Sequence, residues 1–311
     1  MVRKLLAKSY VFLILLLMYV PILVLIIYSF TVSNNIGEWN GFSLDLYARL
    51  FRNKDIMIAL GNTIIIAIIS AICSTVLGTL GAIGVYYSKK RSKAISETIT
   101  QIPTFNAEIV IALSLVFTFV FAGSYIFKAD LFGFWTLLIG HMVLSLPFVY
   151  LNVKPKLQQM DPSLYEAALD LGCNPGNALK RVVFPQIFPG IVSGFLLALT
   201  LSLDDFIVTV FTTGPGLLNG AGKIVTISTF IQSVIKKKVV PIELRALTTV
   251  IFLAVVVAAI CVSIYQFQQR KRAKKRIYTR KYIVLKNISI AATGLILIGL
   301  VITMLALIAT M

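Results

Sequence analysis

Long apolar runs alternate with shorter polar segments along the whole of this 311-residue chain. A helix that crosses a bilayer needs about 20 mostly apolar residues, because each residue advances the helix by about 1.5 Å. Seven runs are long enough and are predicted to be membrane-spanning helices: residues 9–30, 61–87, 104–127, 132–153, 191–212, 246–266 and 287–310. The pattern therefore predicts an all-α membrane protein.

The composition supports a membrane protein and argues against a nucleic-acid partner. Hydrophobic residues make up 58% of the chain, against roughly 45–50% in soluble domains. A net charge of +17 could indicate nucleic-acid binding, but the basic residues gather between the apolar runs, as they do in membrane proteins. We expect contact with membrane lipid and no nucleic acid. The three cysteines lack metal-ligand spacing, so neither a metal nor a cofactor is expected.

The distribution of Lys and Arg predicts how the chain crosses the membrane. If the N-terminus is cytoplasmic, 20 of the 29 basic residues fall on the cytoplasmic side and nine on the other side. The largest group lies in the linker 269–286, which is predicted to be cytoplasmic. Lys236, Lys237 and Lys238 fall on the outer side, which weakens this orientation without reversing it. After seven spans, the C-terminus is expected to be extracytoplasmic.

The polar insert 154–190, between the fourth and fifth runs, has the most ordered pattern in the chain. Residues Tyr165 to Leu171 are predicted to form a short helix that Gly172 can end. A turn at Asn174-Pro175-Gly176 then leads to a second short helix over 177–184. The pattern predicts a helix-turn-helix elbow at the membrane surface. On this pattern alone, a solvated amphipathic connector fits equally well.

The spacing inside the insert resembles a cytoplasmic motif of ABC importer permeases. That motif reads Glu-Ala-Ala, three residues, Gly, nine residues, Ile, one residue, Leu-Pro. The corresponding residues here are Glu166, Ala167, Ala168, Gly172, Val182, Phe184 and Pro185. Valine for isoleucine and phenylalanine for leucine are the departures, and both stay apolar.

The resemblance implies a type I ABC importer permease fold. Six core spans would lie in residues 1–268, and residues 287–311 would add one further transmembrane helix. In that family the insert forms coupling helices that sit in a groove of the ATPase. The resemblance therefore implies a role in ATPase coupling for five residues: Glu166, Ala167, Ala168, Gly172 and Pro185.

Two adjacent acids, Asp204 and Asp205, lie deep in the fifth run, roughly 20 Å from its start. A carboxylate facing lipid there would cost about 2.5–3.5 kcal/mol. On a continuous helix Asp205 shares one face with Ser202 and Thr209. We predict that this face lines the substrate path or meets a partner permease, and that other spans hold Asp204. Alternatively, both are buried structural acids that are hydrogen-bonded or paired with basic groups.

These residues narrow the resemblance to spermidine/putrescine importers, specifically the second of their two permeases. The sequence Ser202-Leu203-Asp204-Asp205-Phe206, followed by Thr213-Gly214-Pro215, resembles that subunit, as do Tyr19-Val20-Pro21 and Pro103. Acids in the path suit a polycation by charge complementarity. The candidate path residues are Ser202, Asp204, Asp205 and Thr209.

The resemblance also implies partners and a location. The chain would be one half of a permease heterodimer in a bacterial cell membrane, with two ATPase subunits and an extracytoplasmic polyamine-binding protein. It would not be an enzyme and would have no catalytic residue, because ATP is hydrolysed on a separate subunit. The chain itself carries no nucleotide-binding motif. The alternatives are an importer of another small cation or organic solute, and a non-transporting scaffold that recruits an ATPase.

Three further features need an interpretation. His141 is interpreted as a packed, hydrogen-bonded histidine in preference to a proton relay, and Glu108 as an acid that the dipole of its helix stabilises. The basic linker 269–286 with the seventh span could anchor the chain on anionic lipid, or could tether a substrate-binding domain beside the permease.

Overall fold

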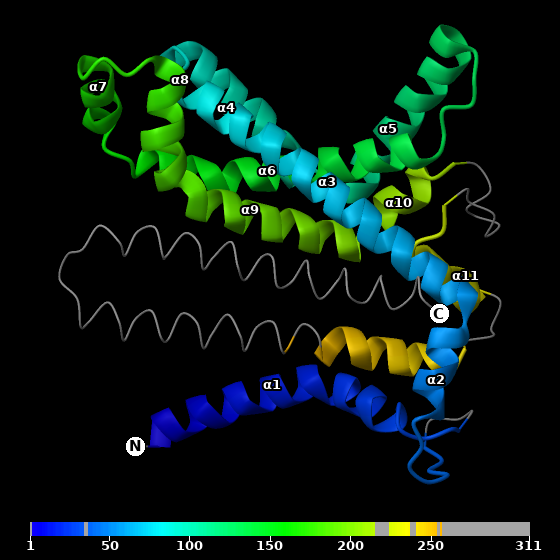
Figure 1. The fold of residues 1–311 in the computed structure, drawn as a ribbon. Coiled ribbons are helices and arrows are strands. Elements are labelled where there is room, and N and C mark those ends of the chain that lie inside the picture. Colours follow the sequence, from blue (N-terminus) through cyan, green and yellow to red (C-terminus); the bar gives the residue numbers. More distant parts are fainter. Residues whose placement is uncertain (1, 34–36, 215–223, 237–240, 254–255, 257–311) are drawn as a thin grey trace. The chain divides into compact units, whose positions relative to one another are not determined.

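The computed structural model describes residues 2–33, 37–214, 224–236, 241–253 and 256, and every regular element in that part is helical (Figure 1). The elements are α1 Val2–Tyr28, α2 Asp45–Arg52, α3 Lys54–Tyr86, α4 Lys90–Phe105, α5 Glu108–Phe121, η1 Ala122–Phe127, α6 Phe134–Gln158, α7 Pro162–Asp170, α8 Pro175–Ala178, η2 Leu179–Val183, α9 Phe184–Asp204, α10 Ile207–Thr212 and α11 Ile227–Lys236. Residues 243–253 are also helical. The elements η1 and η2 are short π-helical segments. The prediction of an all-α chain is confirmed for the described residues.

Five of the described helical stretches are long and apolar enough to cross a membrane: Ser9–Tyr28, Lys54–Tyr86, Glu108–Phe127, Phe134–Gln158 and Pro175–Asp204. The first and fourth overlap the predicted spans closely, and the second ends where predicted but begins seven residues earlier, at Lys54. The predicted sixth span lies only partly within the described residues, and the seventh span and the linker 269–286 lie outside them.

The third predicted span is wrong at its start. Helix α4 runs through Pro103 to Phe105, and Asn106 and Ala107 interrupt it before α5 begins at Glu108. Ala107 is extended, with φ −61° and ψ 137°. The sequence pattern missed α4 because its first half is polar and because no described residue of α4 is buried.

The fifth predicted span is wrong at both ends. The second short helix predicted at 177–184 is not separate, because α8, η2 and α9 form one stretch from Pro175 to Asp204. Proline removes a backbone N–H and crowds the carbonyl four residues earlier. Pro185 nevertheless lies within the stretch, directly after the π-helical turns of η2, a segment that widens the helix. At the other end the helix stops at Asp204 and restarts at Ile207.

Residues 58–233 form one of two compact units. Within this unit α6 packs along α9 (Figure 1). The shared core includes Val149 and Val153 from α6 and Ile187 from α9. A Cβ at Gly194 would lie 3.2 Å from the Val149 Cα, so the two backbones approach closely at this glycine.

Residues 1–57 and 234–311 form the other unit. Here the segment after α1 is held by side-chain contacts. The Phe30 ring stacks on Phe42 with centroids 5.4 Å apart, and the hydroxyls of Ser29 and Tyr47 lie 2.8 Å apart. Arg245 donates to the Ser33 carbonyl at 2.9 Å. These contacts give the connection between α1 and α3 a defined structure.

Candidate functional site

The short helix α7 carries the Glu-Ala-Ala motif and has defined caps at both ends. Its N-cap is Asp161, whose carboxylate accepts from the Ser163 N–H at 3.0 Å. At its other end, Gly172 N–H donates to the Leu169 carbonyl at 2.9 Å and Cys173 N–H to the Ala168 carbonyl at 3.0 Å. This pair of bonds is a Schellman motif, which needs a left-handed residue at the glycine position. Gly172 has φ +82°, so the motif glycine is there for its backbone conformation.

The surface of α7 is open. None of its residues is buried, and Glu166 and Ala167 are exposed. Leu171, at the end of the helix, is 89% exposed. The structure brings the motif residues from Glu166 to Gly172 together on this one helix and its final turn. Pro185, the last motif residue, is exposed in the first turn of α9.

The break in the fifth span is built around Asp205. Its backbone is extended, with φ −64° and ψ 129°. One carboxylate oxygen accepts from the Val208 N–H at 3.2 Å, and the other from the Thr209 N–H at 2.8 Å. Asp205 therefore caps α10, and its charge meets the positive end of that helix. Its side chain is 1% exposed.

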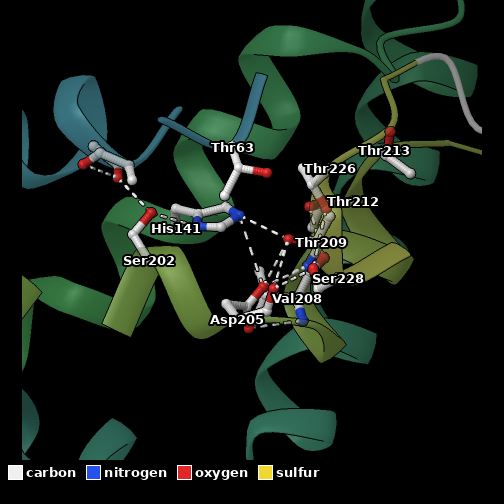
Figure 2. A network of polar contacts seen from close by, with 12 residues as sticks. Thr63, His141, Ser202, Asp205, Val208, Thr209, Thr212, Thr213, Thr226 and Ser228 are labelled. Carbon is white, nitrogen blue, oxygen red and sulfur yellow. Dashed lines mark hydrogen bonds and ion pairs between the residues drawn. The ribbon is translucent and has the colours of Figure 1, made fainter. Parts of the chain in front are cut away.

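His141 from α6 connects the two sides of the break (Figure 2). Its Nδ1 lies 2.7 Å from Ser202 Oγ in α9, and its Nε2 lies 2.9 Å from Thr209 Oγ1 in α10. The Thr209 hydroxyl donates to the Asp205 carboxylate at 2.9 Å, so it accepts from Nε2–H. A neutral imidazole then accepts from the Ser202 hydroxyl at Nδ1. The chain of hydrogen bonds thus has one direction and ends on the carboxylate.

Further hydroxyls tie this network to neighbouring helices. Ser202 Oγ lies 2.9 Å from Ser70 Oγ in α3. The Ser228 hydroxyl in α11 donates to the Asp205 carbonyl at 2.9 Å, and the Ile227 N–H donates to Thr63 Oγ1 at 2.8 Å. Side chains from α3, α6, α9, α10 and α11 therefore meet around the break (Figure 2).

The structure reverses the predicted orientations of the two acids. Ser202, Asp205 and Thr209 do come together, but all three are buried inside the chain and satisfied by hydrogen bonds. Asp204 is exposed, and among the described residues no span forms a salt bridge with it. The prediction failed because it counted residues along a continuous helix, whereas the helix ends between the two acids. For Asp205 the alternative of a buried structural acid describes the geometry, and His141 is the packed, hydrogen-bonded residue that was expected.

Sequence reasoning did not connect Glu108 with these acids. Glu108 is exposed in the first turn of α5, directly after the break at residues 106–107. It interacts electrostatically with Asp205 and Asp204, and α5 packs against α10. The signal in the sequence that could have identified Glu108 as a site residue is its position, directly after the polar interruption of an apolar run. Two helix breaks therefore bring carboxylates into one region.

Within the part of the chain that the structure describes, no group of three or more His, Cys, Asp or Glu side chains could hold a metal ion. Cys73 and Cys173 are free thiols.

Comparison with known proteins identifies the class of this polytopic helical protein. Residues 74–277 match the family model described as "Binding-protein-dependent transport system inner membrane component". The chain is 32% identical over 260 residues to the spermidine/putrescine transport system permease protein PotC of Escherichia coli K12, covering 84% of this chain and 93% of PotC. Identity to PotC of Haemophilus influenzae is 33%, covering 80% and 92%. Identity to the putrescine permease PotI of Escherichia coli K12 is 33%, covering 76% and 82%.

A solved structure agrees on the fold. The crystal structure of a bacterial ABC transporter that imports the acidic polysaccharide alginate superposes with a TM-score of 0.64 at 21% identity, covering 86% of this chain and 95% of that one. The chain belongs to the binding-protein-dependent transport permeases, the membrane subunits of ABC importers. It is a transport subunit and not an enzyme, since ATP is hydrolysed on a separate ATPase in such importers. Members of this family are inner-membrane components that depend on a binding protein.

Proposed function

We propose that this chain is one permease half of an ATP-driven polyamine importer. The relatives with the names quoted above carry spermidine or putrescine, and the chain aligns with nearly their full length. A polyamine is a flexible chain with several ammonium groups, so a path that conducts it needs carboxylates whose charge is not already neutralised by the protein.

The meeting of two interrupted helices supports this proposal most directly. Interrupted membrane helices are where many transporters bind substrate, because the broken backbone and the helix ends supply polar groups inside the bilayer. Here the break before α5 presents Glu108 and the break after α9 presents Asp204. Within the described residues neither acid forms a salt bridge, and both are exposed. We assign contact with the cation to Glu108 and Asp204, and a supporting role to Ser202, Asp205 and Thr209.

The coupling role belongs to α7 and the turn that follows it. Glu166, Ala167 and the exposed Leu171 offer an open helical surface to an ATPase subunit. From this turn the helix Pro175–Asp204 leads without interruption to the break. A displacement of the turn would therefore reach Asp204 along one helix. Ala168, Gly172 and Pro185 keep the turn and the helix start in shape for that contact.

The remaining assignments follow from this role. We place the N-terminus and α7 in the cytoplasm, where ATP is available, and the C-terminus outside. The chain pairs with a second permease, two ATPase subunits and an extracytoplasmic polyamine-binding protein. The extra C-terminal span holds that binding protein near the permease or anchors the chain on anionic lipid.

Uptake of radiolabelled spermidine into vesicles that contain the complete transporter tests the proposed cargo. Asp204→Asn and Glu108→Gln each remove one charge and are expected to raise the KM for spermidine roughly tenfold, a change equivalent to about 1.4 kcal/mol. Asp55→Asn is the matched control, because Asp55 is also exposed in the first turn of an apolar helix. It is expected to leave uptake unchanged.

Other outcomes would favour the alternatives. A wild-type complex that hydrolyses ATP and imports a different small solute, without spermidine, would make the chain an importer of that solute. A complex that binds its ATPase and imports nothing would make it a scaffold. Glu166→Arg tests the coupling assignment, because uptake that survives this charge reversal would rule out a coupling role for Glu166.

A further inference from the structure

The helix α7 packs against its sequence neighbours η2 and α8, and one of its side chains, Tyr165, also contacts helices far away in the sequence. None of its residues is buried, yet Tyr165 packs partly against the core that includes Tyr150 and Val153. The Tyr165 ring also contacts the ring of Tyr87, with centroids 5.3 Å apart and planes inclined by 45°. Tyr87 directly follows the last residue of α3. Tyr165 therefore joins the motif helix to the end of a helix far away in the sequence.

The contact continues from α3 to α4. The rings of Tyr86 and Tyr87 meet edge to face with centroids 5.0 Å apart. Lys93 in α4 places its Nζ 5.1 Å from the centre of the Tyr86 ring, a cation–π distance. Glu97, one turn further along α4, forms a salt bridge of 3.1 Å with Lys154 in α6. Tyr165 thus contacts a cluster in which the ends of three helices are already fixed to one another.

Helix α3 leads from this cluster to the polar network at the break. Ser70 lies roughly 25 Å from Tyr87 along the helix axis, and its hydroxyl is 2.9 Å from that of Ser202. The helix Pro175–Asp204 carries Ser202 and starts just after the motif turn. Two uninterrupted helices, α3 and the stretch that ends in α9 (Figure 1), therefore run from the neighbourhood of α7, and the buried hydroxyls of Ser70 and Ser202 join them.

This arrangement has a physical consequence for movement. If α9 moved alone, the buried bond between Ser70 and Ser202 would break. Each hydroxyl would keep one partner, Ser70 the Ala67 carbonyl and Ser202 the His141 ring, so the loss is that of one hydrogen bond, about 0.5–1.5 kcal/mol. If α3 moved together with α9, the bond would persist, and the network around His141 would move as one body. Joint movement of α3 and α9 requires a link between α3 and α7. The contact between the rings of Tyr165 and Tyr87 is such a link.

We propose that Tyr165 and Tyr87 are positioning residues that make α3 follow the movement of α7, so that both sides of the Ser70–Ser202 bond move together. The inference rests on the proposed coupling role of α7. Without the contact between Tyr165 and Tyr87, the ATPase subunits still hydrolyse ATP, but part of the movement that they pass to α7 no longer reaches the break at Asp205.

The test compares Tyr165→Ala, Tyr87→Ala, their double variant and Tyr165→Phe in the complete transporter. The measured quantity is ATP hydrolysed per spermidine imported. Each alanine variant is expected to raise this ratio roughly two- to tenfold, the range that one aromatic contact supports. The double variant should resemble the single variants, because both remove the same contact. Tyr165→Phe keeps the ring and should stay near wild type.

Tyr125→Ala is the matched control. Tyr125 is 75% exposed, and its ring contacts Phe121 in the adjoining turn of the same stretch. It should leave the ratio unchanged. The inference is overturned if the alanine variants keep the wild-type ratio, or if ATP hydrolysis and import fall in proportion, since that would indicate lost assembly. Additive effects in the double variant would also overturn it.

A readout that needs no substrate separates this inference from the proposed cargo. Leu203 is 42% exposed beside the break, so a Leu203→Cys variant without native cysteines can report thiol labelling before and after trapping with ATP and vanadate. Labelling that changes in the Leu203→Cys parent and changes less when Tyr165→Ala is added supports the inference even if spermidine is not the cargo. An equal change in both proteins overturns it. No change in the Leu203→Cys parent overturns the coupling role of α7 and this inference with it.

Discussion

His141 and Asp205 face each other across the hydroxyl of Thr209. The distance from His141 Nε2 to the nearer Asp205 oxygen is 3.7 Å, too long for a hydrogen bond, whereas Thr209 Oγ1 lies 2.9 Å from each. The Thr209 hydroxyl therefore bridges the His141 ring on α6 and the Asp205 carboxylate that caps α10. The shape of the break depends on this one hydroxyl as much as on the two ionisable groups.

Thr209→Val is expected to destabilise the protein by about 1–3 kcal/mol, because it keeps the shape of the side chain but leaves a buried imidazole N–H without an acceptor. Thermal unfolding of the purified transporter measures the effect. Thr118→Val is the matched control, since the Thr118 hydroxyl is exposed and donates to the Ser114 carbonyl of its own helix. Equal melting temperatures for the two variants would contradict the assigned role of Thr209.

Gly172 in the turn after α7 and Gly176 in α8 separate the effect of backbone conformation from that of side-chain size. Gly172 has φ +82°, and a Cβ added there would meet nothing within 4 Å, so Gly172→Ala acts through backbone strain of about 1–2 kcal/mol. It is expected to open the Schellman turn and to lower transport by weakening contact with the ATPase. Gly176 lies in α8, where a Cβ would meet only the Asn174 side chain, at 3.9 Å. Gly176→Ala should retain transport.

Two quantities are measured for each variant: ATP-driven uptake, and the amount of ATPase subunit that co-purifies with the permease. The Gly172 variant should lose part of both, while the Gly176 variant should keep both. Equal loss in the two variants would mean that bulk at the docking surface matters, and that the left-handed backbone at Gly172 does not.

Gly140→Ala tests the close approach of α6 and α10. A Cβ at this position would lie 2.7 Å from Val208 Cγ1 and 3.0 Å from Thr212 Cγ2, and both neighbours are buried. Overpacking of this kind costs about 1–3 kcal/mol. The displaced α10 should weaken the cap at Asp205, so that both melting temperature and uptake fall. Gly84→Ala in α3 is the control, because a Cβ there meets nothing within 4 Å; a matching loss in that variant would refute the packing argument.

The sequence predicted the class, the approximate places of the membrane-spanning helices within the described residues and the site of the elbow, because those features depend on local composition and spacing. It did not predict the break at Asp205. Asp204 and Asp205 occur in an apolar run without proline or glycine nearby, and the break is stabilised by His141, which lies 64 positions earlier in the chain. Helix α4 was missed for a related reason, since its exposed polar half has no apolar face that a pattern could reveal. A contact distant in sequence decided the first case, and the lack of a buried face decided the second.

Adjacent acids with opposite environments give a last prediction, on stability alone. Asp205→Asn places an amide N–H₂ where the carboxylate now accepts from two backbone N–H groups and the Thr209 hydroxyl. Hydrogen bonds to a charged group contribute about 1.5–3 kcal/mol, so the variant should unfold at a lower temperature by an amount of that order. Asp204→Asn, at an exposed position, should leave the free energy of unfolding within about 0.5 kcal/mol of wild type. Thermal unfolding of the two single variants side by side decides the matter, because a larger loss in Asp204→Asn would reverse the roles that the structure gives to the two carboxylates.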